Sequence, residues 1–221
     1  MPGSRCQNKF QAVQGVIAVF CTCKGTRIQF VKLILASTSR YRKELLSRLG
    51  MPFEVAAPDV DETPLPGETP LALASRLARA KALKVAANYT DGLIIGSDQV
   101  AACNGEILGK PGTHENAVRQ LLLLSGREAE FHTALCVHDA GSGRTLQRSV
   151  LNKVLFRTLS PGLIERYLRR EMPYDCAGSA KSEGLGIALI QKLGGDDPNA
   201  LVGLPLIALV DLLLEHGLEL P

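Results

Sequence analysis

The amino-acid sequence predicts an α/β protein whose mixed, twisted β-sheet is flanked by helices. Short apolar segments alternate along the chain with segments whose apolar residues recur at helical spacing, which is typical of strands and helices around one sheet. Residues 131–137 and 150–156 are two long strand-like runs around the turn Ala140-Gly141-Ser142-Gly143, which predicts a hairpin. A hairpin inside an alternating pattern indicates both parallel and antiparallel strand pairs.

The first half of the chain contains clear start and stop signals for its elements. Serine or threonine before an apolar periodic segment can cap a helix, proline favours the first helical position, and glycine ends a helix. In chain order, we expect a strand at 33–36, a helix capped by Ser39 and stopped by Gly50, a strand at 53–57, a helix from Thr69-Pro70 to about residue 87, and a buried strand at 93–95 that ends at residues 96–99.

The second half repeats these signals around the hairpin. A helix is expected over residues 113–124, closed by Ser125-Gly126. Ser160-Pro161 begins another helix that runs to Arg170, and Pro205 begins a last one. The inner face of that last helix is predicted to carry Leu206, Leu209, Val210 and Leu213.

Residues 1–30 differ from this pattern. Val13 to Cys23 is an apolar-leaning run after Arg5 and Lys9, as in a short signal peptide, but Gln14-Gly15 interrupts it. Our hypothesis is that translation starts at Val31, that residues 1–30 are an N-terminal extension, and that residues 31–221 form the domain. The chain of 221 residues suits one large domain or two small lobes that share a core.

Composition excludes several classes of protein. The net charge of +3 is too small to imply nucleic-acid binding, and no apolar run reaches the roughly 18 residues of a membrane span. The six cysteines lack zinc or redox spacing, so we expect reduced thiols in a cytoplasmic protein. The segments 105–111 and 184–189 each fail a phosphate-binding motif, and no G-x-S-x-G nucleophile elbow is present.

Two charged residues stand in apolar surroundings. Asp98 follows an apolar strand, where a carboxylate can hold a cation or accept a proton from water, although it can also be a turn aspartate. Lys81 interrupts the apolar stripe of its helix between Leu77, Ala78 and Val85. It must either extend its ammonium to solvent or find an anion.

Other polar residues complete a possible site. Glu62, in an acidic loop, could bind Mg2+ together with Asp98 or belong to a polar turn. Lys110 stands between Gly109 and Pro111 on a stiff backbone that could aim it at phosphate, and a solvated lysine is an equal alternative. With Arg42, these lysines would neutralise a polyphosphate while the carboxylates hold metal and activate water, as phosphoryl-bond hydrolysis requires.

The same residues carry a family resemblance. In order, the chain contains Ala36-Ser37-Thr38-Ser39-Arg40-Tyr41-Arg42, Val60-Asp61-Glu62, Ala80-Lys81-Ala82, Gly96-Ser97-Asp98-Gln99-Val100, Gly109-Lys110-Pro111 and Gly203-Leu204-Pro205. This series resembles the Maf family of nucleoside triphosphate pyrophosphatases across about residues 32–219. The resemblance implies an inosine-triphosphatase-like fold with two lobes around a central cleft. It also implies hydrolysis between the α and β phosphates with a divalent cation, Mg2+ or Mn2+.

The resemblance also assigns roles. It implies that Asp98 is the catalytic proton acceptor, that Glu62 shares the metal, and that Ser37, Arg42, Lys81 and Lys110 bind the substrate. Tyr41, Gln99 and Glu183 stand where branches of the family differ, and this combination is similar to the branch that acts on 7-methyl-GTP. Arg, Thr and Gln would be expected there in the branch that handles dTTP and UTP.

Physical chemistry agrees with the branch assignment. A methylated guanine is cationic, so the ring of Tyr41 can attract it, and Glu183 can accept hydrogen bonds from its edge. Arg40, where many relatives carry proline, adds a charge beside this pocket. We therefore expect a cytoplasmic housecleaning enzyme, with a homodimer possible by analogy and neither nucleic-acid nor membrane partners. The alternatives are a nucleotide-binding regulator of cell division and septum formation with little turnover, or a Maf pyrophosphatase with broader or dTTP/UTP preference.

Overall fold

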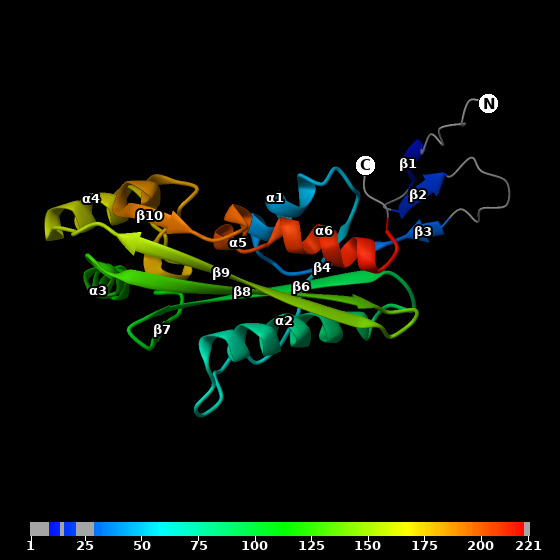
Figure 1. Ribbon diagram of the computed structural model, residues 1–221, viewed down its shortest axis with the longest axis horizontal. Helices are drawn as coiled ribbons and strands as arrows, with labels where there is room; N and C mark the ends of the chain where they lie inside the picture. Colours follow the sequence, from blue (N-terminus) through cyan, green and yellow to red (C-terminus); the bar gives the residue numbers. More distant parts are fainter. Residues whose placement is uncertain (1–8, 14–15, 21–28, 219–221) are drawn as a thin grey trace.

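The computed structural model describes residues 9–13, 16–20 and 29–218 (Figure 1). In the apolar-leaning run from Val13 to Cys23, the described residues are 13 and 16–20. More than half of the predicted N-terminal extension lies outside the described ranges. Its described parts are β1 (Lys9–Val13), β2 (Val16–Phe20) and β3 (Gln29–Val31), which form an antiparallel three-stranded sheet. Of the cysteines, Cys103, Cys136 and Cys176 are described and free.

The main sheet has seven strands and is mixed, as predicted. Its order is β10-β9-β8-β6-β4-β5, with β7 paired to β6. Pairs among β4, β5 and β6 are parallel, whereas the remaining pairs, including the predicted β8–β9 hairpin, are antiparallel. The strands are β4 (Leu33–Ala36), β5 (Glu54–Ala56), β6 (Leu93–Cys103), β7 (Glu106–Leu108), β8 (Glu128–Asp139), β9 (Thr145–Phe156) and β10 (Ile190–Gly194).

The helices begin where the sequence places their caps. The hydroxyls of Ser39, Thr69, Thr113 and Ser160 each accept a backbone N–H in the first turn of the helix that follows. Two short helical turns, residues 177–179 and 185–189, and α5 were not predicted. The α-helices are α1 (Arg40–Ser47), α2 (Pro70–Ala86), α3 (His114–Leu124), α4 (Pro161–Glu171), α5 (Pro198–Val202) and α6 (Leu206–Glu215).

Helices cover both faces of the sheet. Figure 1 shows α2 on one face and α1, α5 and α6 on the other. Alternation along β4 serves both layers, because Leu33 and Leu35 pack with α6 while Ile34 and Ala36 pack with α2. In the described chain, no helix is long and apolar enough to cross a membrane.

A separate core at the far end of the long strands accounts for the predicted second lobe. It joins α3 and α4 to the second half of β6, through residues such as Ala101, Leu121 and Ile164. The long strands β6, β8 and β9 therefore run through both lobes.

The predicted end of the strand at residues 96–99 is wrong, because β6 continues to Cys103. Pairing with β8 extends from Leu93 to Ala102 and holds this longer strand. On the opposite edge, β4 pairs with residues 93–96 and β7 with residues 101–103. Among the described strands, none pairs with residues 97–100 on that edge. Asp98 therefore lies inside a strand, beside the place where β4 ends.

Close packing of α2 on β6 depends on Gly96. A Cβ at this position would overlap the carbonyl oxygen of Ala78 and lie 2.8 Å from the amide nitrogen of Ala82. Both contacts are with the backbone of α2, so a flexible side chain cannot relieve them.

We expect Gly96→Ala to lower the free energy of unfolding by about 1–3 kcal/mol, because the added methyl group would push α2 away from β6. Denaturant unfolding measures this change. Gly109→Ala is the matched control, because its added Cβ has nothing within 4 Å. Equal stability of the two variants would contradict this account of the helix–strand contact.

Candidate active site

A cavity of about 650 Å3 opens at the interrupted edge of β6. The β4–α1 junction, the loop after β5, helix α2, the loop after β7, residues 175–183 and the α5–α6 turn contribute to its lining. All nine residues predicted for the site line it: Ser37, Tyr41, Arg42, Glu62, Lys81, Asp98, Gln99, Lys110 and Glu183. The structure therefore brings together residues that are separated by up to 146 positions in the chain.

Lys81 is buried, and its ammonium lies between two carboxylates. Its Nζ is 2.5 Å from Asp98 Oδ1 and 2.6 Å from Glu62 Oε1. The Lys81 side chain is only 7% exposed, so it does not extend to solvent. Gly96 makes this contact possible, because close packing of α2 brings Lys81 onto Asp98. The alternatives of a solvent-directed lysine and a turn aspartate are thus excluded.

The pKa values of the two carboxylates shift in opposite directions although both groups contact one ammonium. Burial raises the pKa of Asp98 above 3.8, and the charges of Lys81 and Arg42 only partly oppose this. For Glu62, burial acts in the same direction, but the hydrogen bond and charge of Lys81, together with Lys110, lower its pKa below 4.5. Burial therefore dominates at Asp98, whereas the surrounding positive charge dominates at Glu62.

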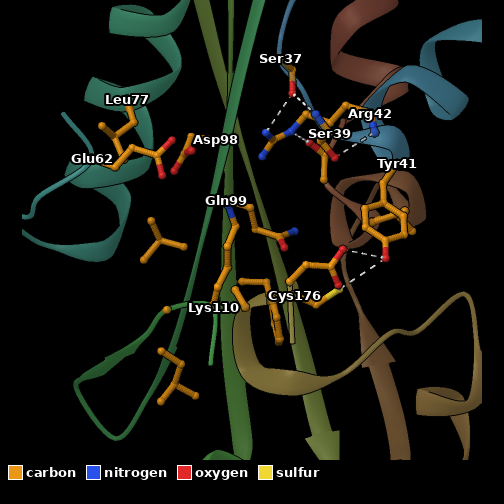
Figure 2. Close-up of a pocket in the computed structure, with 18 of the residues that line it drawn as sticks. Ser37, Ser39, Tyr41, Arg42, Glu62, Leu77, Asp98, Gln99, Lys110 and Cys176 are labelled. Atoms are coloured by element: carbon orange, nitrogen blue, oxygen red, sulfur yellow. Dashed lines mark hydrogen bonds between the residues drawn. The ribbon is translucent and has the colours of Figure 1, made fainter. Parts of the chain in front are cut away.

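Arg42 is held at the junction of β4 and α1. Its Nε donates to the carbonyl oxygen of Gly203 at 2.8 Å, and its Nη1 lies 3.5 Å from the hydroxyl of Ser37. The hydroxyl of Ser97 is 3.0 Å from the same Gly203 oxygen, which fixes the α5–α6 turn against β6. Figure 2 shows Arg42 and Ser37 across the opening from Glu62. The sequence marked Gly203 as part of the Gly203-Leu204-Pro205 motif but gave it no role, and the structure shows its carbonyl as a positioning group.

Lys110 lies on the loop between β7 and α3, and this loop is tied to the opposite wall. The amide of Gln120 donates to the Gly109 carbonyl at 2.9 Å, while its oxygen accepts from Ser179 at 2.6 Å. The backbone N–H of Gly112 also donates to the Tyr174 carbonyl at 3.1 Å. Lys110 itself is exposed, and its charge contributes to the lowered pKa of Glu62.

The three predicted specificity residues line the cavity in different ways. Tyr41 is half-buried, and Figure 2 shows it across the cavity from Asp98. The amide of Gln99 donates to the carbonyls of Ala200 and Leu201 at 2.8 and 3.0 Å, so it also anchors α5. Glu183 is exposed at the rim.

Asp175 and Cys176 also line the cavity, and sequence reasoning missed them. Tyr41 donates its hydroxyl hydrogen to Asp175 Oδ2 at 3.2 Å, and the Cys176 Sγ lies 3.9 Å from the same hydroxyl (Figure 2). Burial raises the pKa of Cys176 to about 12, which disfavours a thiolate. These residues lie in an irregular segment without apolar periodicity, so no local pattern marks them.

The donor set fits a divalent cation that is shared with a substrate. Glu62 and Asp98 lie side by side on Lys81, and no group of three or more potential metal ligands exists among the described residues. Mg2+ is commonly bound by one or two carboxylates together with substrate phosphates rather than by a complete protein cage. Two convergent carboxylates are consistent with that kind of site.

Comparisons with known proteins agree with the geometry. Residues 32–216 match the Maf-like protein family. A 7-methyl-GTP pyrophosphatase from Burkholderia thailandensis is 57% identical over 192 residues, covering 86% of this chain and 89% of that protein. Proteins of the same name from Polaromonas sp. and Methylobacillus flagellatus are 58% and 57% identical, covering 85% of this chain in both cases and 86% and 97% of their own lengths.

Solved structures are more distant. The Ham1 protein of Staphylococcus aureus has a TM-score of 0.42 and 17% identity, covering 57% of this chain and 72% of that chain. A HAM1 protein from Coxiella burnetii has the same TM-score and identity, covering 72% of this chain and 98% of its own.

We expect Lys81→Met to lower the free energy of unfolding by about 3 kcal/mol, because it leaves the buried Asp98 without its cation. Adding Asp98→Asn should recover part of that loss, since it removes the carboxylate charge that Lys81→Met leaves without its ammonium. Denaturant unfolding of the two single variants and the double variant completes the cycle. Strictly additive losses would show that Lys81 and Asp98 do not stabilise each other.

Proposed function

The chain belongs to the Maf-like protein family, and from this premise we propose that it is a nucleoside triphosphate pyrophosphatase. Its proposed reaction converts 7-methyl-GTP to 7-methyl-GMP and pyrophosphate. The observation that carries this proposal is the buried Asp98, with a raised pKa, in a cavity that also contains Lys81 and Arg42. The names of the relatives support the choice of substrate.

The cations of the cavity suit a triphosphate. Lys81 and Arg42 both line the opening, and Lys110 lies on the loop after β7 (Figure 2). In this proposal they offset the negative charge that grows on the leaving pyrophosphate, which is the main requirement of phosphoryl-bond hydrolysis. Ser37 lies within reach of the Arg42 guanidinium and adds a hydroxyl to this polar end.

Asp98 is the proposed general base. Lys81 contacts its Oδ1, which leaves Oδ2 to accept a proton from the attacking water. A raised pKa makes the deprotonated carboxylate a stronger proton acceptor. Glu62, whose pKa is lowered, stays ionised and compensates the charge of the Lys81 ammonium that it contacts.

A divalent cation, Mg2+ or Mn2+, would be held by Glu62 and Asp98 together with phosphate oxygens. When bound, it would supply charge neutralisation at the phosphates. This assignment rests on the donor chemistry of the two carboxylates and on the family to which the chain belongs.

At the base end, the proposal assigns Tyr41 to attract the cationic 7-methylguanine ring and Glu183 to accept hydrogen bonds from its edge. Gln99 acts through α5, whose carbonyls it binds. The housecleaning role, the cytoplasmic location and the homodimer remain predictions alongside this assignment.

An endpoint assay with 7-methyl-GTP, GTP, dTTP and UTP tests the activity. With Mg2+ or Mn2+, we expect pyrophosphate release that is greatest with 7-methyl-GTP, measured separately from orthophosphate. Orthophosphate alone, or a preference for dTTP and UTP, would overturn the proposal.

Asp98→Asn should lower kcat by at least about 100-fold while nucleotide binding is largely kept, because a general base contributes roughly 100- to 10,000-fold. Unchanged turnover would remove Asp98 from its role.

The pH dependence of kcat/KM provides a second test. Asp98 acts only when deprotonated, so activity should fall as pH decreases through a pKa above 3.8. Removing the Lys81 charge in Lys81→Gln should move this limb to higher pH, because that charge lowers the pKa of Asp98. If the acidic limb of the kcat/KM profile is the same in Lys81→Gln as in the native protein, it reports titration of the substrate and not of Asp98.

A further inference from the structure

Tyr41 contacts two side chains of opposite charge, and neither has a role in the proposed reaction. Arg40 Nη2 donates to the Tyr41 hydroxyl at 2.7 Å, and the Arg40 guanidinium carbon lies 4.8 Å from the ring centroid. The same hydroxyl donates to Asp175 Oδ2 at 3.2 Å. Arg40, Tyr41 and Asp175 all line the cavity. The aromatic ring that would receive the base therefore already binds one cation and one anion.

Both neighbours of Tyr41 carry their charges near neutral pH. Burial would raise the pKa of Asp175, but hydrogen bonds from Cys176 and a backbone amide, with the charge of Lys181, lower it below 3.8. The hydrogen bond to Tyr41 raises the already high pKa of Arg40. Lys181 Nζ lies somewhat farther away, 5.7 Å from the ring centroid.

This group lies apart from the residues assigned to proton transfer. Figure 2 shows Tyr41 and Cys176 on the side of the cavity away from Asp98 and Glu62. A charge beside Tyr41 therefore acts mainly on the base of a bound nucleotide. Guanine and 7-methylguanine differ by one methyl group and one positive charge, so their relative binding measures the local electrostatic field.

We propose that Asp175 and Arg40 set the preference of this cavity for a cationic base in opposite directions. Asp175 favours the cationic base by direct attraction. Arg40 opposes it, because its guanidinium occupies the π-system of Tyr41 and repels a second cation there. This inference rests on the proposed nucleotide substrate, and it names two specificity-determining residues beyond Tyr41, Gln99 and Glu183.

The test compares kcat/KM for 7-methyl-GTP with kcat/KM for GTP in single charge-neutral variants. Arg40→Gln should raise this ratio about three- to tenfold, and Asp175→Asn should lower it by a similar factor, as expected for unit charges several ångströms apart at a partly solvated site. The ratio cancels any change in phosphate binding, since both substrates carry the same triphosphate. Asparagine keeps an acceptor for the Tyr41 hydroxyl, so the ring retains its anchor.

Lys43→Gln is the matched control, because Lys43 is an exposed cation on the same helix and does not line the cavity. It should leave the ratio unchanged. Ratios that stay constant in the Arg40 and Asp175 variants, or move in the same direction in both, would overturn the proposal. Loss of both activities in equal measure would likewise indicate a structural role only.

A binding measurement keeps this inference separate from the proposed activity. The same variants are titrated with 7-methyl-GMP and GMP, and the ratio of their dissociation constants should shift in the same opposite directions. If the native protein releases no pyrophosphate, the proposed function fails while this ratio still decides the inference. If pyrophosphate is released and the ratios do not move, the inference alone fails.

Discussion

The interrupted edge of β6 is the constraint on which the site depends. Because β4 ends at Ala36 and β7 pairs only from Ala101 onward, residues 97–100 have no strand beside them on that edge in the described sheet. A continuous sheet would separate the residues of its two faces. At this opening, side chains from both faces of the sheet lie at one place. Alternation along β6 directs Asp98 toward α2, while Ser97 and Gln99 contact the α5–α6 side.

The buried charges around Lys81 are stable only as a group. A lysine whose side chain is 7% exposed would be costly alone, but Asp98 and Glu62 compensate its ammonium at 2.5 and 2.6 Å. The same arrangement shifts the pKa values of the two carboxylates in opposite directions, because burial dominates at Asp98 while at Glu62 the nearby cations outweigh burial. Packing of α2 on Gly96 thus determines both the stability of the helix and the electrostatics of the cavity.

The walls of the cavity are connected rather than independent. Gln120 bonds to Gly109 on the loop that carries Lys110 and to Ser179 on the wall that carries Asp175 and Glu183. Arg42 similarly joins the β4–α1 junction to Gly203. Irregular segments therefore supply much of the lining, whereas the sheet and α2 hold the groups assigned to proton transfer, as in other α/β proteins with functional loops on a rigid scaffold.

The sequence alone determined the mixed α/β class, the hairpin, the helix starts at Ser39, Thr69 and Ser160, and a set of polar residues that line one cavity, because caps, turns and family motifs are local patterns. Tertiary structure decided the rest. Only strand pairing shows that β6 continues past Asp98, and only helix packing shows that Lys81 is paired rather than solvated. Asp175 reaches Tyr41 across 134 positions of the chain. Contacts of that range depend on how the elements pack, and no periodicity within a few residues encodes them.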